Sequence, residues 1–248
     1  MRTVVIAGGT RGIGGALAAR LRERGDNVIA IGSADADLTS VRQTTRLIDR
    51  LPGRIDALVL AAGRFDQRRV ETGEGLEQTF AIYVVSRYLL ADRLRPALEA
   101  AATTPVVLNL SGTGGIKAGR IHWDDLQLTR DYTMFRATMQ GARSNDLLGI
   151  DFAATRPGRV RYVLYNPLFV DSGMHRQFRQ PLRTLIGTAA ALLGTTVDAA
   201  AVPLADLLDN PPDAPLTALR RGKPVALSAD PAAAARLRAV LTDLVDRV

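Results

Sequence analysis

The sequence predicts a single α/β domain over residues 1–248, built on a doubly wound parallel sheet. Three observations support that fold class. Apolar runs and glycine-containing turns alternate in strand, turn, helix order, which is the pattern of a parallel sheet with crossover helices. A glycine-rich turn follows the first apolar run and leads into a helical segment. The length of 248 residues, 47% of them hydrophobic, allows one complete core.

The expected strands are short apolar runs bounded by turn residues. The first run is Arg2-Thr3-Val4-Val5-Ile6-Ala7, and five more follow it along the chain. Strands are therefore expected at 2–7, 27–31, 55–61, 105–110, 160–166 and 223–227.

The expected helices occupy the segments between and after these runs. They are 13–24, 39–50, 76–101, 137–155, 183–194, 197–208 and 232–246. Pro96 falls inside the third of them, where its ring and its missing amide hydrogen favour a kink or a break. The last helix is rich in alanine, and a proline-rich turn at 211–215 precedes the final strand.

Composition narrows the kinds of site. The chain has no cysteine and only two histidines, His122 and His175, so we expect no disulfide, no thiol nucleophile and no metal centre. The net charge of +7 comes mostly from arginines scattered singly, with no basic run of five or six. Because a nucleic-acid footprint needs clustered basic residues, we expect a small anionic molecule as the partner and no nucleic acid.

No stretch of the sequence approaches the roughly 18 to 20 uncharged apolar residues that a bilayer span needs. The N-terminus enters a strand directly and lacks the basic and apolar regions of a secretion signal. We therefore expect a cytoplasmic protein with no membrane partner.

The glycine-rich turn is the first candidate binding site. It reads Gly8-Gly9-Thr10-Arg11-Gly12-Ile13-Gly14 and lies between a strand and a helix. Gly8 and Gly12 allow the turn and the close approach of a pyrophosphate, and Gly14 lets the helix pack on the strand. The helix N-terminus offers free amides and a positive dipole to an anion. A turn that binds nothing is the alternative.

The amino-acid sequence of this turn, with three residues between its first two functional glycines, resembles the cofactor loop of the short-chain dehydrogenase/reductase superfamily. Further segments are similar in the same order: Asp37-Leu38-Thr39, Leu60-Ala61-Ala62-Gly63, and the stretch from Asn166-Pro167 to Val170. The resemblance implies a Rossmann domain that binds a nicotinamide dinucleotide. It implies cofactor contacts from these residues: Gly8, Thr10, Arg11, Gly12, Ile13, Gly14, Ser33, Asp37, Leu38, Ala61, Ala62, Gly63, Pro167 and Val170.

The residues after the second strand bear on which dinucleotide binds. An acid there would accept from a ribose hydroxyl and indicate NAD, but Gly32 and Ser33 follow instead. Arg11 supplies a guanidinium suited to a phosphate. We therefore expect NADP(H) in preference to NAD(H), with weak binding or no cofactor as alternatives. Only 32–36 separate this strand from Asp37, so the usual helix is expected to be missing and the adenosine end open.

In its second half the chain resembles the retinol-dehydrogenase-like branch of that superfamily. The similar segments run from Gly75 to Tyr83, from Asn109 to Gly112, from Ile121 to Gln127, from Ala137 to Asn145, and from Tyr165 to Ser172. Aligned on them, the family's catalytic Asn, Ser, Tyr and Lys are replaced by Tyr83, Gly112, Thr138 and Ala142.

The chemical consequence of these replacements is large. In the family the tyrosine exchanges a proton with the substrate, the lysine lowers its pKa and holds the ribose, and the serine polarises the carbonyl. Thr138 can donate a hydrogen bond but is far too weak an acid, and Ala142 cannot hold a ribose. Tyr83 is expected to face the nicotinamide pocket, either as a functional group or as a ring that fills the space.

A second alignment stays open. None of the five tyrosines has a lysine at the fourth place after it, but Tyr132 is followed at that place by Arg136. On a helix this pair would share one face, and the arginine would lower the tyrosine pKa. His175, in an expected lid from about 170 to 200, is a further catalytic candidate. His122 with Asp124 and Asp125 is a weaker acid–base cluster.

Three functions follow from these alternatives. The first is an NADP(H)-binding protein that acts on a small carbonyl or alcohol metabolite by altered redox or non-redox chemistry. The second is a catalytically silent binding subunit or sensor. The third is an ordinary oxidoreductase that uses Tyr132 and Arg136. The resemblance implies a homodimer or homotetramer, or a hetero-oligomer with an active homologue.

Overall fold

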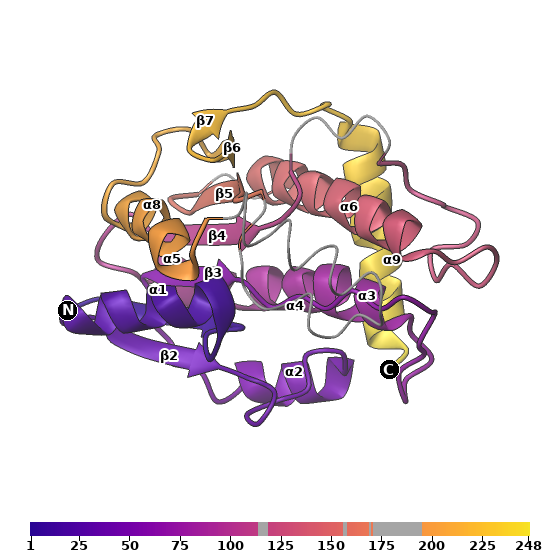
Figure 1. Ribbon diagram of the computed structural model, residues 1–248, viewed down its shortest axis with the longest axis horizontal. Coiled ribbons are helices and arrows are strands. Elements are labelled where there is room, and N and C mark those ends of the chain that lie inside the picture. The colour runs from indigo at the N-terminus through magenta and orange to yellow at the C-terminus, as the bar shows by residue number, and fades with distance from the viewer. Residues whose placement is uncertain (114–118, 156–157, 169, 171–194) are drawn as a thin grey trace.

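The computed structural model describes residues 1–113, 119–155, 158–168, 170 and 195–248. Its centre is a seven-stranded sheet in the order β2-β1-β3-β4-β5-β6-β7 (Figure 1). The first six strands pair in parallel, and β7 runs antiparallel to β6. The strands are β1 Thr3–Ala7, β2 Asn27–Ile31, β3 Ala57–Leu60, β4 Val106–Leu110, β5 Arg161–Asn166, β6 Leu216–Arg220 and β7 Lys223–Pro224.

Helices cover both faces of the sheet. They are α1 Gly12–Glu23, α2 Val41–Ile48, α3 Gln78–Phe80, the π-helix η1 Ala81–Val85, α4 Ser86–Arg93, α5 Arg95–Glu99, α6 Met134–Thr155, α8 Val197–Asp209 and α9 Pro231–Asp246. Side chains alternate along β1, so Val4 and Ile6 pack with α1 and α8 while Val5 and Ala7 pack on the opposite face. The doubly wound α/β fold predicted from the sequence is confirmed.

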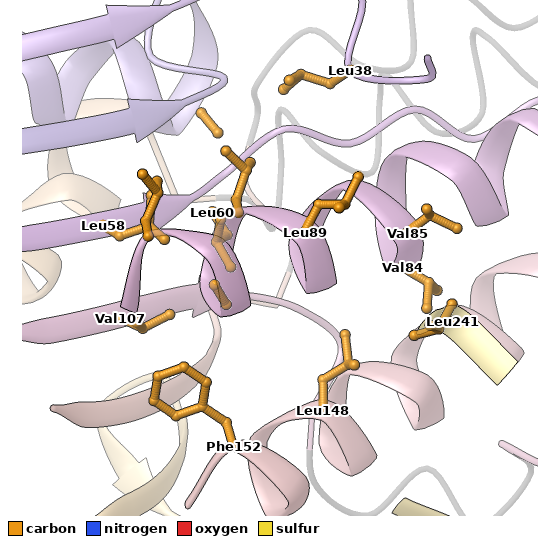
Figure 2. Close-up of a cluster of buried hydrophobic side chains, with 14 of the residues drawn as sticks. Leu38, Leu58, Leu60, Val84, Val85, Leu89, Val107, Leu148, Phe152 and Leu241 are labelled. Atoms are coloured by element: carbon orange, nitrogen blue, oxygen red, sulfur yellow. The ribbon is translucent and has the colours of Figure 1, made fainter. Parts of the chain in front are cut away.

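The second face carries the larger core, which α2, α4, α6 and α9 share (Figure 2). Helix α9 contributes Ala234, Leu237, Leu241 and Val245, all buried and spaced three or four residues apart along one side. Two polar contacts fasten it at its exposed margin: the Tyr88 hydroxyl lies 2.8 Å from that of Thr242, and Arg238 donates to Asp151 at 3.0 Å. The C-terminal helix therefore packs along α6 and reaches α4 through Tyr88.

Five of the six expected strands match the structure to within three residues at each end. The prediction was wrong at the sixth. It placed a strand at 223–227, where β7 has only two residues, and it missed β6, which completes the parallel sheet. Leu216–Arg220 has the sequence LTALR, too short and too polar at its ends to stand out as an apolar run.

The expected helix 76–101 is divided in the structure. It breaks at Leu94, and Pro96 stands in the first turn of α5, where a missing amide costs nothing. The break expected from Pro96 is thus confirmed, whereas the π-helical turn at 81–85 was not foreseen. The other described helices lie within three residues of their expected bounds. The expected helix at 183–194 lies outside the described residues.

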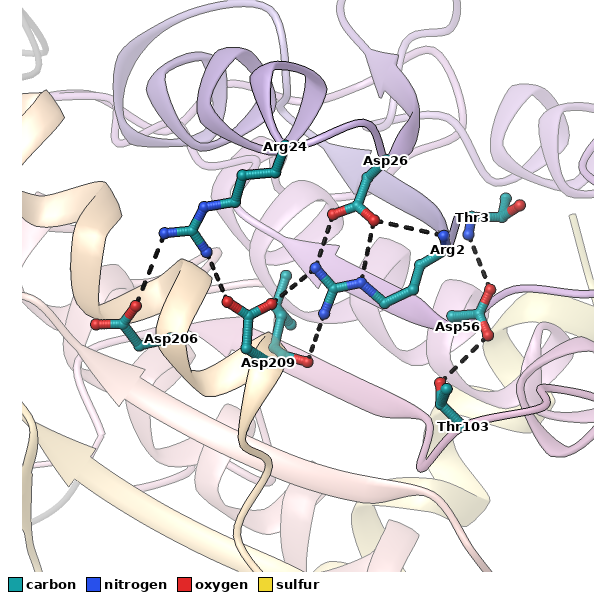
Figure 3. A network of polar contacts seen from close by, with 9 residues as sticks. Arg2, Thr3, Arg24, Asp26, Asp56, Thr103, Asp206 and Asp209 are labelled. Atoms are coloured by element: carbon teal, nitrogen blue, oxygen red, sulfur yellow. Dashed lines mark hydrogen bonds and ion pairs between the residues drawn. The ribbon is translucent and has the colours of Figure 1, made fainter.

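A polar network closes the edge of the molecule at the amino ends of the strands (Figure 3). Arg2 bonds Asp26 at 2.7 Å and Asp209 at 2.8 Å, and its guanidinium also donates to the Leu208 carbonyl at 2.9 Å. Arg24 bonds Asp209 at 2.6 Å. Burial raises the pKa of Asp26, but the Arg2 charge outweighs it and holds that pKa below its ordinary value. No helix within the described ranges is long and apolar enough to cross a membrane.

Candidate functional site

The carboxyl ends of β1, β3 and β4 meet at the edge of the sheet opposite this network, and the sequence-predicted cofactor loop lies there. Gly8 follows β1 with a φ of 84°, which a side chain would strain. A Cβ atom at Gly8 would stand 2.5 Å from the Ala62 amide nitrogen. The glycine therefore lets the turn after β1 pack directly on the turn after β3, which contains Ala61, Ala62 and Gly63.

The N-terminus of α1 is open to an anion. Its N-cap residue, Arg11, makes no side-chain cap, whereas Ser40, Thr196 and Asp230 each accept an amide hydrogen at the start of α2, α8 and α9. The dipole of α1 and its first amides are therefore unneutralised by any capping side chain. The residues present fit a pyrophosphate at this point.

A cavity of about 520 Å³ adjoins this helix end. Two arginines, Arg11 and Arg22, and one acid, Asp198, bring charge to its wall. Its other lining residues are Gly9, Thr10, Gly12, Gly15, Ala16, Ala30 and Val197. Thr10, Arg11 and Gly12, three of the predicted cofactor residues, thus line one cavity. With two arginines and one acid, the wall of this cavity has a net positive charge.

The adenosine end is short, as the sequence predicts. No helix lies in residues 32–40, and Ser33 is exposed. Asp37 is also exposed, but its carboxylate accepts from the amide and hydroxyl of Thr39 at 2.9 and 2.8 Å. Leu38 is buried in the core. The expectation that no acid stands at the end of the second strand was wrong, because the Asp35 carboxylate folds back onto the Gly32 amide at 2.7 Å.

Tyr83 lies in the π-helix η1, and its hydroxyl reaches Gly112, just beyond the end of β4. A wider helical turn leaves a backbone carbonyl without its usual partner, and here Asn145 donates to the Tyr83 carbonyl oxygen at 2.8 Å. The same amide donates to the Gly141 carbonyl at 2.8 Å. Asn145 is fully buried, and its hydrogen bond to Tyr83 joins α6 to the π-helix.

The Tyr83 ring is only 5% exposed and is held on several sides. Phe65 packs edge-on at 5.2 Å between ring centres, and the Arg87 guanidinium lies 4.2 Å from the ring centre. A Cβ atom at Gly141 would stand 2.4 Å from the ring, so only glycine fits there. The hydroxyl accepts from the Gly112 amide at 3.0 Å. Burial raises the Tyr83 pKa, and the Arg87 charge acts against that rise.

Arg87 forms the centre of a buried polar network that the sequence analysis missed. Its guanidinium donates to the carbonyl oxygens of Leu110 and Ala62, both at 2.7 Å, and to the side chain of Asn109. Asn109 in turn donates to Tyr162 and to Asn145, both at 2.8 Å. Burial lowers the Arg87 pKa and raises that of Tyr162 to about 12. An arginine inside the largely apolar run 80–91 was the available signal.

The two alternative catalytic pairs, Thr138 with Ala142 and Tyr132 with Arg136, lie in different places on and before α6. The Thr138 hydroxyl donates to the Met134 carbonyl of its own helix at 2.7 Å, and Ala142 is buried one turn further on. Tyr132 precedes the helix and donates to the Asp66 carbonyl at 2.8 Å. Arg136 turns back to the Asp131 carbonyl at 2.6 Å. Tyr132 and Arg136 therefore bind different partners.

The remaining candidates are spread around this edge. His122 lies 3.3 Å from Arg136 through Nδ1 and is half-buried. Amides of Arg130 and Thr129 lower the Asp125 pKa to about 2, so that carboxylate is a turn cap. Pro167 is half-buried, and Val170 forms an isolated bridge to Thr195. His175 and most of the expected lid lie outside the described residues. Within those residues no cluster of three or more acids or histidines is placed to hold a metal.

Comparison with curated proteins identifies several relatives, although no family model matches the chain. It is 30% identical over 193 residues to a candidate daunorubicin C-13 ketoreductase from a Streptomyces strain, covering 67% of this chain and 65% of that protein. It is 25% identical over 236 residues to human dehydrogenase/reductase SDR family member 12, covering 81% and 73%. With mouse retinol dehydrogenase 13 it shares 28% over 151 residues, covering 50% and 45%. The chain thus spans less than two thirds of the first and third of these relatives.

Solved structures share the fold over almost the whole chain. An uncharacterised protein from Mycobacterium paratuberculosis superposes with a TM-score of 0.75 at 24% identity, covering 99% of this chain and 94% of that one. A 3-alpha-hydroxysteroid dehydrogenase from Pseudomonas, complexed with NADH, gives 0.69 at 21%, covering 89% and 96%. A small-chain dehydrogenase in complex with NADPH gives 0.67 at 13%, covering 88% and 95%.

Proposed function

Because the chain belongs to the short-chain dehydrogenase/reductase superfamily, with relatives that fit its retinol-dehydrogenase-like branch, we propose that it is a nicotinamide-dependent oxidoreductase. Its substrate is the carbonyl or alcohol group of a small organic metabolite. The turn after β1 would hold the dinucleotide, and the free amides at the start of α1 would hold its pyrophosphate. When bound, the dinucleotide supplies or accepts a hydride.

One observation carries this proposal. The α1 N-terminus is the start of a helix without a capping side chain, and it adjoins a cavity lined by Arg11 and Arg22. A helix end and two guanidinium groups together favour a phosphorylated ligand. Asp35, the acid at the end of β2, bonds the Gly32 amide and does not line that cavity. We therefore propose a preference for NADP(H) over NAD(H), set by Arg11.

We further propose that the catalytic pair of the family is absent from α6. Thr138 and Ala142 occupy that helix where the alignment puts the tyrosine and lysine, and the Thr138 hydroxyl is already bound within the helix. The second candidate is a silent binding subunit, favoured by the Tyr83 ring, which fills the space beside Gly141 and Gly112. The cytoplasm is the proposed location.

Titration calorimetry tests the cofactor site. Wild-type protein should bind NADPH more tightly than NADH, and Arg11→Ala should weaken NADPH binding by about 1.5 to 3 kcal/mol, roughly 10- to 150-fold, because an arginine–phosphate contact is lost. NADH binding should change much less. Arg20→Ala is the matched control, since Arg20 lies on the same helix but does not line the cavity. Equal affinity of the wild type for both dinucleotides would reject the preference.

The same sample separates the oxidoreductase from the silent subunit. Reduced-nicotinamide absorbance should fall when ketones are supplied to the holoprotein. Tight binding with no absorbance change across a broad panel of ketones and alcohols favours the silent subunit. Failure to bind either dinucleotide rejects both.

A further inference from the structure

Tyr83 and Arg87 stand four residues apart on the helix that leads away from β3, and both side chains reach the ends of the central strands. We propose that Tyr83 donates the proton in the carbonyl reduction and that Arg87 is the fixed cation that supports it. This inference rests on the proposed oxidoreductase function. It assigns the acid to the π-helix instead of to α6.

The position of the Tyr83 hydroxyl is the first argument. Its oxygen lies 3.0 Å from the Gly112 amide nitrogen. Gly112 stands where the family has its catalytic serine in the alignment above. Tyr83 therefore brings a hydroxyl next to the residue where the alignment puts the catalytic serine.

The hydrogen-bond pattern leaves this hydroxyl ready to donate. The Gly112 amide is a donor, so the Tyr83 oxygen accepts in that contact and keeps its own hydrogen. No acceptor for that hydrogen is present among the described residues around it. The ring is held by Phe65 and by the close approach of Gly141, so the hydroxyl is fixed in place before any substrate binds.

Arg87 is the second argument. Its guanidinium is anchored by the carbonyls of Ala62 and Leu110, at the ends of β3 and β4, and stands over the Tyr83 ring. In the part of the chain that the structure describes, no carboxylate lies within ion-pair distance of it. Its charge is therefore not cancelled locally and favours a negative charge on the neighbouring phenol.

The proton balance of the step is simple. The carbonyl carbon of the substrate gains a hydride from the reduced nicotinamide, and the carbonyl oxygen gains the Tyr83 proton. The product is an alcohol, the dinucleotide is oxidised, and Tyr83 is left as a phenolate that recovers a proton from water. Burial raises the Tyr83 pKa and keeps the phenol protonated beforehand, while Arg87 and the Gly112 amide stabilise the phenolate that forms.

The test is Tyr83→Phe, which keeps the ring packing and removes only the hydroxyl. With NADPH and any ketone that the wild type reduces, kcat should fall by about 10² or more. NADPH affinity measured by calorimetry should change less than about twofold, because the hydroxyl does not bind the dinucleotide phosphates. Tyr88→Phe is the matched control: it removes a hydroxyl from the α9 side of the same helix and should leave kcat unchanged.

A readout in cofactor-free protein tests the role of Arg87. The ionisation of Tyr83 is measured by phenolate absorbance during an alkaline titration. Subtracting the titration curve of Tyr83→Phe from that of the wild type isolates the contribution of Tyr83. Arg87→Met should move that transition to higher pH, and Arg87→Lys should restore much of it. The other charged or titratable groups that face this pair are Asp146 on α6, which acts against the phenolate, and Tyr162 on β5, whose pKa burial raises to about 12.

The outcomes are distinct. A Tyr83→Phe enzyme with wild-type kcat, or a Tyr83 transition that ignores the charge at position 87, would overturn this inference while leaving the oxidoreductase intact. A wild type that binds the dinucleotide but reduces nothing would overturn it too, and would favour the silent subunit. Loss of dinucleotide binding in the wild type would reject the proposed function itself.

Discussion

Tyr132 lies two residues before α6 begins, and its hydroxyl is already engaged with the Asp66 carbonyl. If this bond is structural, Tyr132→Phe should cost about 0.5 to 1.5 kcal/mol of unfolding free energy and change kcat by only a few-fold. Chemical denaturation and steady-state kinetics on the same sample measure both. A fall of about 10² in kcat with unchanged stability would instead make Tyr132 the general acid.

Single residues show how far sequence reasoning reaches. Arg11 was predicted to serve a phosphate because it stands inside a recognisable turn; the structure puts it on a cavity wall, and its role stays a prediction. Asp35 could not be foreseen, because its carboxylate reaches the end of β2 only through a tight loop bond to Gly32. Arg87 was passed over because a helical arginine is usually solvated, although the apolar residues on both sides of it were a sign that its side chain is buried.

At the scale of the elements, the contact between α6 and the π-helix sets the geometry of the site. Gly141→Ala would place a methyl group 2.4 Å from the Tyr83 ring, and neither helix can yield easily because Asn145 joins them. We expect a net destabilisation of about 1 to 3 kcal/mol from overpacking, even though alanine is the better helix former. Thermal denaturation measures it.

Gly149→Ala is the control for that substitution. It lies on the same helix, but a Cβ atom there would stand 3.0 Å from Leu216, 3.1 Å from Leu164 and 3.3 Å from Tyr162, so each neighbour need move only a few tenths of an ångström. The control should lose much less stability. If the two variants melt at the same temperature, the Tyr83 ring is not confined as described.

Helices and strands were predictable from the sequence where apolar residues recur at the spacing of a helix or form a strand-length run. The π-helical turn at 81–85 could not be predicted, because it depends on an amide from α6 that is distant in the chain. Strand β6 was not predicted, for a similar reason. Leu216–Arg220 is too short and too weakly apolar to identify alone, and its pairing with β5 defines it as a strand. Local patterns specify most elements, and long-range contacts specify these two.

At the scale of the whole molecule, α9 is the element that closes the second core. Leu241 is fully buried in that core and lies beside Val84 (Figure 2), so Leu241→Ala should lower the unfolding free energy by about 2 to 5 kcal/mol. Asp243→Ala, on the exposed side of α9, breaks only a surface ion pair with Arg247 and should cost about 1 kcal/mol or less. Urea denaturation of both variants measures the difference. Comparable midpoints would mean that α9 is not part of the cooperative core.

The position of α9 also bears on self-association. The expected dimer or tetramer stays a prediction. Helix α9 packs along one part of α6 (Figure 1), so a second copy that approached that part would meet α9 first. The overall fold was predictable from sequence, whereas this packing was not, because the alanine-rich segment gives no sign of where it packs.

The position of β2 at the edge of the sheet has a last consequence, which concerns aggregation. Within the described residues β2 pairs only with β1, so its other margin presents amides and carbonyls with no strand beside them. Its sequence, NVIAI, contains no charge and no proline, the two features by which natural proteins keep such margins from joining. Extended segments of unfolded chains can add there by backbone pairing alone. The unpaired margin of β2 is therefore a template on which we expect misfolded protein to accumulate.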